Sequence, residues 1–202
     1  MIDYKKAQKL QASLCPELGI RVRLYSKGSG KWKSSSGERS KFGLTTVELL
    51  QALEILDKAE LQDRLSMLHF HIGSQITAIK HFKNAIREAA YVYAKIVKMG
   101  FSPKYLNIGG GIGVDYDGSQ TTAQSSANYS LQEIANDAVY LIKEVCKKEN
   151  VACPHIITES GRVVAAYHSV VATDIREVQG EESLESFEGV DFSKPPEGSH
   201  KS

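Results

Sequence analysis

The feature that most limits how this chain can fold is a regular alternation of short apolar runs with helical segments. Four runs have the residue content of strands, at 19–25, 64–73, 105–108 and 155–160. Such alternation is typical of parallel strands joined by crossover helices. The sequence therefore predicts an α/β fold. Its 202 residues hold four units, which is half of a (β/α)8 TIM-type barrel of roughly 250 residues.

Three helices are predicted between these runs. Thr45 with Glu48, and Ser130 with Glu133, have the spacing of capping boxes that open helices. A third helix can end at Gly100 through a left-handed cap. Its apolar face is expected to consist of Phe82, Ile86, Ala89, Tyr93 and Val97.

The remaining segments differ in composition from the α/β part. Residues 26–41 are rich in Ser, Gly and Lys, which favours an exposed or ligand-covering loop. Residues 163–178 return to strand-like residues, as if the chain were leaving for a β domain. Residues 179–202 are polar and acidic, typical of a disordered tail or truncated linker. We therefore expect a partial barrel domain over 1–178, followed by this tail.

Charge and hydropathy exclude several classes of function. Lys and Arg number 25 against 24 Asp and Glu, so the chain lacks the positive field of a non-specific nucleic-acid binder. No run approaches the roughly 20 apolar residues of a membrane span, and the N-terminus lacks the apolar core of a signal peptide. The three cysteines match neither a disulfide framework nor a zinc knuckle. The sequence predicts a cytoplasmic protein that binds neither nucleic acid nor membranes.

The second run ends in HFHIGSQ at 69–75, which carries two histidines in a strand-like context. His69 and His71 share one side of a strand because alternate residues face the same way. One of them could face a ligand. The competing interpretation is a pair of core histidines bonded to backbone carbonyls.

The third run ends in NIGGGIGVDYDG at 107–118, where consecutive glycines let the backbone approach an anion with several N–H donors. It is not a dinucleotide fingerprint, because Val114 stands where that motif needs glycine. A tight turn with positive φ angles is the alternative.

The fourth run ends in TESGR at 158–162, with a carboxylate and an arginine separated by two small residues. Glu159 could hold a proton on a ligand nitrogen while Arg162 binds a phosphate; a surface ion pair is the alternative. Ligands of parallel α/β folds bind at the carboxyl ends of strands. The three ends together supply what a phosphorylated pyridine cofactor needs.

These segments resemble one known family, the biosynthetic arginine decarboxylases of the alanine-racemase-like, fold type III group of pyridoxal-phosphate enzymes. The likeness runs from about Gly19 to Val178 and includes RVRLYSKGSGKWKSSSGERSKFGL, LHFHIGSQI, NIGGGIGVDYDGSQT and ITESGR. It implies that His71 stacks on the pyridine ring and that Glu159 bonds the ring nitrogen, both as catalytic residues. The cofactor-binding residues that it implies are Arg23, His71, Ser74, Gly109, Gly110, Gly111, Glu159, Gly161 and Arg162. The substrate segment that it implies includes Gly113, Asp115 and Tyr116.

The resemblance also implies an activity. Pyridoxal 5'-phosphate, with Mg²⁺ as a further cofactor, would serve the conversion of L-arginine to agmatine and CO₂ in polyamine and spermidine synthesis, within a homo-oligomer. The family's Schiff-base lysine lies upstream of the matched residues and its β domain is missing. We therefore expect a fragment with little or no activity alone.

Two other classes remain open. A metal-dependent TIM-barrel hydrolase could use His69 and His71 as a ligand pair, but it needs further His or Asp ligands at later strand ends. A non-catalytic homologue could instead pair with a full-length decarboxylase. The family interpretation assigns no metal ligand to this chain.

Overall fold

The structure is a computed structural model, and it describes residues 16–26, 40–169, 171, 172 and 174. Most of the predicted 26–41 loop and the whole predicted tail lie outside the described residues. The chain divides into two units, residues 1–168 and 169–202. The domain boundary expected at 178 stays a prediction.

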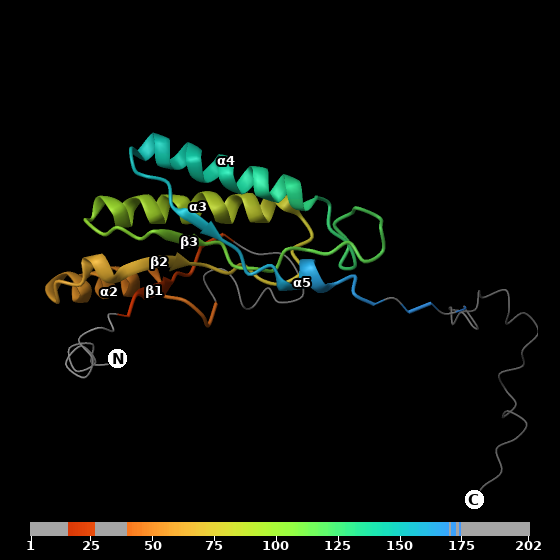
Figure 1. Cartoon of the computed structure of the whole chain (residues 1–202), viewed down its shortest axis with the longest axis horizontal. Helices are drawn as coiled ribbons and strands as arrows, with labels where there is room; N and C mark the ends of the chain where they lie inside the picture. Colours follow the sequence, from red (N-terminus) through yellow and green to blue (C-terminus); the bar gives the residue numbers. More distant parts are fainter. Residues whose placement is uncertain (1–15, 27–39, 170, 173, 175–202) are drawn as a thin grey trace, which may run out of the picture. The chain divides into compact units, whose positions relative to one another are not determined.

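The described elements alternate as the sequence predicts. In chain order they are β1 (Leu18–Arg21), α2 (Thr46–Lys58), the 3₁₀ helix η2 (Gln62–Arg64), β2 (Leu65–His69), α3 (Ile79–Lys98), β3 (Tyr105–Asn107), α4 (Leu131–Glu149), β4 (His155–Ile157) and α5 (Gly161–Ala165). The strands form one sheet in the order β1-β2-β3-β4 (Figure 1). Every neighbouring pair is parallel. This confirms the α/β class and a partial barrel.

Strand register divides the sheet into two chemically different faces. One aligned row, in which the first three members are buried in the core, consists of Ile20, Leu68, Leu106 and Ile156. The next row consists of Arg21, His69, Asn107 and Ile157. The run at 64–73 predicts a strand covered on both faces. On the second face Leu65 is buried, while Met67 and His69 are partly buried. This face carries the polar side chains of Arg21, His69 and Asn107 next to apolar ones.

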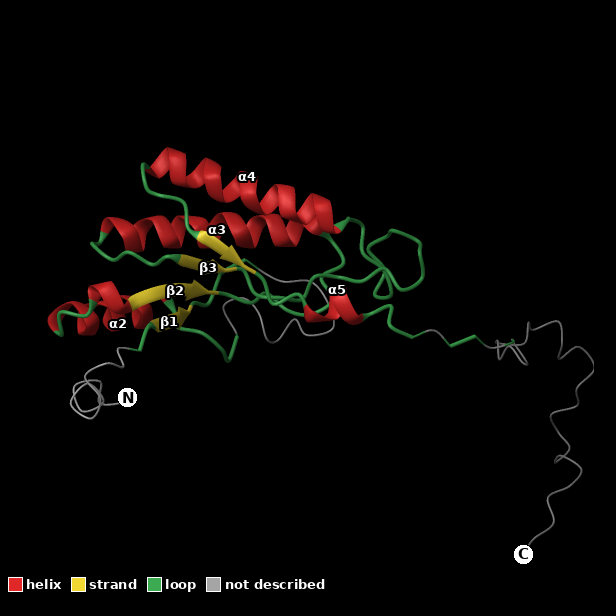
Figure 2. Ribbon diagram, in the orientation of Figure 1, coloured by secondary structure: helices red, strands yellow, loops and turns green. Residues whose placement is uncertain are grey.

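Helix ends follow local sequence signals. The Thr45 hydroxyl accepts a hydrogen bond from the Glu48 N–H at 3.3 Å, and Ser130 with Glu133 forms the same capping box. Gly100 follows α3 with φ +93°, as predicted. Helices α3 and α4 contact each other and lie side by side (Figures 1 and 2). None of the described helices combines the length and apolarity needed to cross a membrane.

The segment after β4 differs from its prediction. Residues 163–165, where the predicted strand-like stretch 163–178 begins, belong to the short helix α5 (Gly161–Ala165). Residues 170, 173 and 175–178 of that stretch lie outside the described residues. Short apolar runs do not by themselves distinguish strand from helix, and here the Ala166 N–H donates to the Arg162 carbonyl at 2.8 Å. The turn that results brings Arg162 back toward the sheet.

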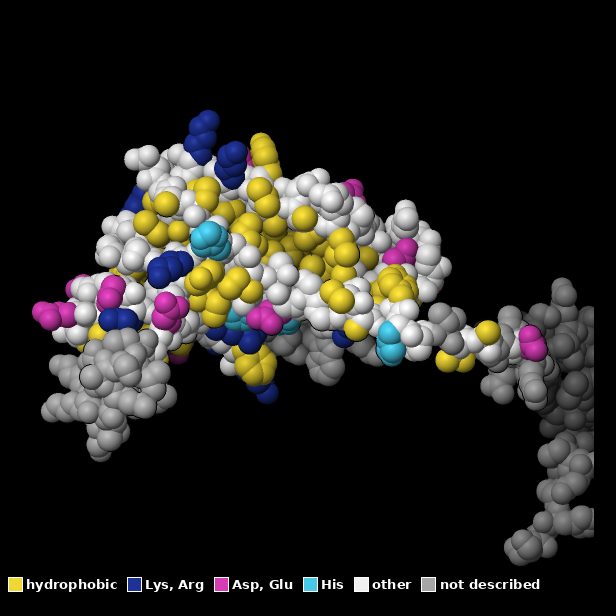
Figure 3. Space-filling view, in the orientation of Figure 1, with side chains coloured by type: hydrophobic (Ala, Val, Ile, Leu, Met, Phe, Trp, Pro, Cys, Tyr) yellow, Lys and Arg dark blue, Asp and Glu magenta, His cyan; other side chains and the backbone are white. Residues whose placement is uncertain are grey.

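Apolar surface is exposed around β4, which pairs only with β3 among the described strands. Figure 3 shows hydrophobic side chains gathered across the middle of one face. Val164 is 85% exposed and Tyr167 is 67% exposed. The predicted tendency of such surface to self-associate stays untested.

Candidate functional site

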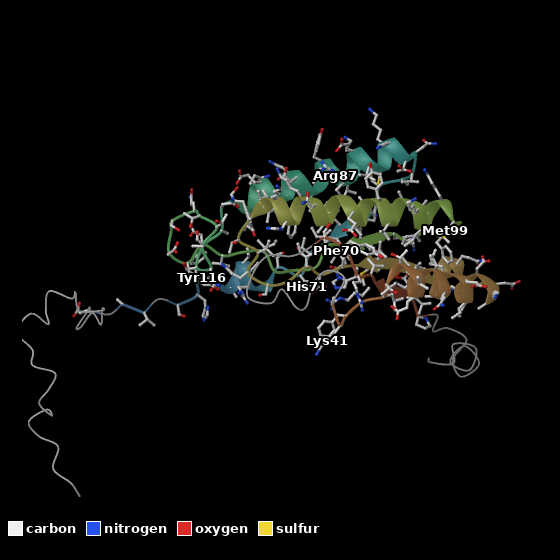
Figure 4. The ribbon with its side chains drawn as sticks, turned by 180° about the vertical axis from the view of Figure 1, so that it is seen from behind. Lys41, Phe70, His71, Arg87, Met99 and Tyr116 are labelled. Carbon is white, nitrogen blue, oxygen red and sulfur yellow. The ribbon has the colours of Figure 1, made fainter. Side chains whose placement is uncertain are left out.

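The predicted strand ends meet around a cavity of about 160 Å³ at the carboxyl edge of the sheet. Its lining comes from the segments that follow β2, β3 and β4 and consists of Ser74, Gly111, Ile112, Glu159, Ser160, Arg162 and Val163. In Figure 4, His71 lies between Tyr116 on one side of the view and Met99 on the other; Met99 directly follows the C-terminal end of α3. The cavity is open, since both Glu159 and Arg162 are exposed.

Arg162 and Ser74 form the cationic corner of this cavity. The Arg162 guanidinium donates from Nη2 to the Ser74 hydroxyl at 3.0 Å, although 88 positions separate the two residues. Helix α5 carries the arginine, and the loop after β2 carries the serine. A charged planar donor beside a hydroxyl suits the oxygens of a phosphate.

Two of the N–H donors of the glycine run have partners within the protein. The Gly109 N–H donates to Asn107 Oδ1 at 2.9 Å, and the Gly110 N–H donates to His71 Nδ1 at 3.3 Å. These two donors are engaged within the protein, so the run does not present all its N–H groups to one ligand. Gly111 is the member that lines the cavity.

Gly111 also shows why glycine is needed here. Its φ is +83°, and a Cβ at this position would lie 1.8 Å from the carbonyl oxygen of Gly73. The loops after β2 and β3 therefore approach too closely for any side chain.

Glu159 is held by a residue that the sequence interpretation missed. The Asn107 side-chain amide donates to Glu159 Oε1 at 2.8 Å, and the Glu159 N–H donates to the Gly109 carbonyl at 2.8 Å. Asn107 is only 4% exposed. The signal for it was a polar residue inside an otherwise apolar run, because buried amides need partners.

His71 is partly buried next to the glycine run. Burial, followed by the nearby Arg21 and His69, lowers the pKa of His71 below its ordinary value of 6.5. A neutral ring agrees with Nδ1 accepting the Gly110 N–H. His69 and His71 are close, as the strand alternation predicts, and His69 Nδ1 is buried without a hydrogen-bond partner in the described part of the chain.

Five of the nine predicted cofactor residues do not line the main cavity, namely Arg23, His71, Gly109, Gly110 and Gly161. Arg23 donates to the Gly43 carbonyl at 3.5 Å and lines a separate, small space together with His71. Gly161 begins α5 but is not among the lining residues. A Cβ on Gly161 would meet nothing within 4 Å, so packing does not require glycine there.

Two of the three predicted substrate residues line a second cavity of about 180 Å³. Gly113 and Asp115 line it, and it shares Val163 with the first cavity. The Asp115 carboxylate accepts from the Ser126 hydroxyl at 2.6 Å and the Gln120 N–H at 3.3 Å, so the loop already uses both oxygens. Tyr116 is 53% exposed and does not line the cavity.

Among the described residues, no group of three or more His, Cys, Asp or Glu side chains could hold a metal ion. The further ligands that the hydrolase alternative requires are therefore not found in this part of the chain.

Comparisons with known proteins point to one family. The family model described as "Pyridoxal-dependent decarboxylase, pyridoxal binding domain" matches residues 2–166. The biosynthetic arginine decarboxylase of Geobacter sp. (strain M21) is 47% identical over 180 residues, covering 89% of this chain and 28% of that protein. The one from Rhodopirellula baltica is 51% identical over 159 residues, covering 79% and 24%. The chain thus spans less than a third of the length of these relatives.

Solved structures agree on the fold. The biosynthetic arginine decarboxylase of Campylobacter jejuni matches with a TM-score of 0.66 at 36% identity, over 79% of this chain and 25% of that one. Diaminopimelate decarboxylase from m. jannaschii, in co-complex with L-lysine, matches with a TM-score of 0.58 over 79% and 35%. At 22% identity, the second match supports the fold alone.

Proposed function

Because this chain belongs to the pyridoxal-dependent decarboxylases and matches their pyridoxal-binding domain, we propose that the cavity between Ser74 and Arg162 holds pyridoxal 5'-phosphate. The observation that carries the proposal is the hydrogen bond between these two side chains at the mouth of a glycine-lined cavity. The Arg162 guanidinium donates here and the Ser74 hydroxyl accepts, but a hydroxyl can also donate, so both groups can turn to the oxygens of one phosphate.

The residues present fit this cofactor. Gly111 lets the backbone of two loops come together without a side chain filling the space between them. Arg162 supplies a positive charge, which is opposite in sign to the charge of the phosphate. Glu159 uses Oε1 to accept from Asn107, which leaves Oε2 to accept from a protonated ring nitrogen.

The chemistry follows from where protons are held. When bound, pyridoxal phosphate supplies an electron sink for the charge left on the α-carbon by loss of CO₂. Glu159 would hold a proton at the ring nitrogen, which keeps that sink effective. His71, kept neutral by burial and by the Gly110 N–H, would cover one face of the ring without repelling the ring's positive charge.

The substrate proposed for the whole protein is L-arginine, and the product is agmatine for polyamine synthesis. The support is the identity to biosynthetic arginine decarboxylases. A cytoplasmic homo-oligomer, which the family resemblance implies, is a further part of the proposal. The Mg²⁺ expected from the family resemblance has no candidate ligand cluster among the described residues.

A segment exchange tests the proposal. Residues 16–168 replace the matching segment of the Geobacter relative, and CO₂ release is measured from carboxyl-labelled arginine, lysine and diaminopimelate. We expect more CO₂ release from arginine than from lysine or diaminopimelate. Arg162→Ala should lower the release from arginine at least about a hundredfold, because a cofactor held in the wrong position no longer orients the substrate. A folded chimera that binds pyridoxal phosphate but leaves arginine intact would contradict the arginine assignment.

A further inference from the structure

The loops after β2 and β3 continue side by side beyond the ends of their strands. The Ile76 N–H donates to the Gly111 carbonyl at 2.9 Å, and Ile76 forms a parallel bridge with Ile112. These loops carry Ser74 and Gly111, which line the cavity together with residues of the segment after β4. The relative position of the two loops therefore sets the shape of the cavity.

Gln75 ties the loops together with its side-chain amide. Its Nε2 donates to the Val114 carbonyl at 2.8 Å and to the Ser126 carbonyl at 3.3 Å, while its Oε1 accepts from the Val114 N–H at 3.1 Å. The amide thus pairs with both backbone groups of Val114 as a neighbouring strand would. Gln75 has φ +53°, an uncommon backbone conformation for a residue other than glycine.

Tyr129 makes a second tie next to the first. Its hydroxyl accepts from the Gly113 N–H at 2.8 Å and donates to the Ile76 carbonyl. Burial raises the pKa of this phenol, so it stays a donor at neutral pH. A Cβ on Gly113 would lie 2.6 Å from the Ile76 oxygen, which shows how closely the hydroxyl holds these two segments.

The ties lie immediately beside the cavity. Gln75 directly follows Ser74, and the Gly113 amide that Tyr129 holds is two positions beyond Gly111. Neither Gln75 nor Tyr129 lines the cavity itself. Their effect on a ligand there must act through the residues that they hold.

We propose that Gln75 and Tyr129 are positioning residues, which fix Ser74 and Gly111 at the separation that the cofactor phosphate requires. This inference rests on the proposed function. It predicts that removing the hydrogen bonds of either side chain weakens binding of the cofactor's phosphate more than binding of its ring.

The test uses the full chain and four variants. Fluorescence titration measures the affinity for pyridoxal phosphate and for pyridoxal, which lacks the phosphate, in Tyr129→Phe and Gln75→Met. Tyr140→Phe and Gln132→Met, on exposed positions of α4, are the matched controls. We expect the ratio of the two affinities to fall about tenfold in each loop variant, as for the loss of a partner to a partly buried polar group, and to stay unchanged in the controls.

Hydrogen exchange gives a readout that needs no cofactor. Tyr129→Phe removes the acceptor of the Gly113 N–H, and Gln75→Met removes the side-chain acceptor of the Val114 N–H. Each of these amides should then exchange faster, while the amides of α3 and α4 keep their protection. If one variant fails to fold, the other still tests the same tie between loops.

The outcomes separate the two proposals. An unaltered chain that binds pyridoxal phosphate no better than pyridoxal contradicts the proposed function, and the positioning role with it. A chain that does prefer the phosphate, with a ratio unchanged in the folded loop variants, contradicts the positioning role alone. A loss of thermal stability with an unchanged ratio also overturns it, because a purely structural role predicts that result.

Discussion

Asn107 donates from Nδ2 to Glu159 Oε1 at 2.8 Å and so joins the end of β3 to the segment that follows β4. Its other polar side-chain atom, Oδ1, accepts a hydrogen bond from the Gly109 N–H at 2.9 Å. One buried amide therefore orients both the carboxylate and the start of the glycine run. Neither contact is visible in the sequence motifs taken separately.

Replacing Asn107 with Leu should destabilise the fold, because it leaves the buried Gly109 N–H without an acceptor. We expect a loss of about 1–3 kcal/mol in the free energy of unfolding, measured by urea denaturation. Asn136→Leu, at an exposed position of α4, should cost less than about 0.5 kcal/mol. Equal losses in both variants would show that the Asn107 contacts carry no stability.

Gly111→Ala should be far more damaging than Gly118→Ala. Both glycines have positive φ, +83° and +73°, so both variants bear the backbone strain of about 1–2 kcal/mol. Only at Gly111 would the new Cβ meet a carbonyl oxygen at 1.8 Å, while at Gly118 it meets nothing within 4 Å. Thermal melts compare the two variants, and similar melting temperatures would contradict the close approach of the two loops.

Acid should destabilise the fold partly through His71. Its pKa is lowered in the folded state, so the unfolded chain takes up the proton first. The contribution of His71 is complete above pH 6.5 and is lost as the pH falls through the folded-state value. Unfolding midpoints at pH 7.5 and 5.5 should therefore differ less in His71→Gln than in the unaltered chain.

The control for that experiment is His155→Gln, on the exposed start of β4. It should keep the full pH dependence of the unaltered chain. If His71→Gln keeps it as well, the neutral ring beside Gly110 is not the source of the effect.

The sequence predicts local features well and long-range contacts poorly. The capping boxes at Thr45 and Ser130 are confirmed because the interacting residues lie three positions apart. Gln75 and Val114 are 39 positions apart, and nothing in either local pattern identifies their pairing. The same holds for Asn107 and Glu159, whose meeting depends on strand order.

Helix α5 shows that residue content alone can indicate the wrong secondary structure. The two valines at 163 and 164 favour a strand, yet the chain turns there and forms one helical turn with Val164 exposed. That turn is what brings Arg162 to Ser74. The family resemblance implies that both residues belong to one site, and the local structure that unites them differs from the expected one.

The most direct test of the central claim is the affinity of the chain for pyridoxal phosphate before and after Arg162→Ala, with Arg87→Ala on α3 as the matched loss of one positive charge. We predict that Arg162→Ala weakens binding of pyridoxal phosphate at least about tenfold, as for loss of a charged hydrogen-bond partner, and leaves pyridoxal binding unchanged. Arg87→Ala should change neither. Equal affinities for pyridoxal phosphate in the unaltered chain and Arg162→Ala would contradict a phosphate site between Ser74 and Arg162.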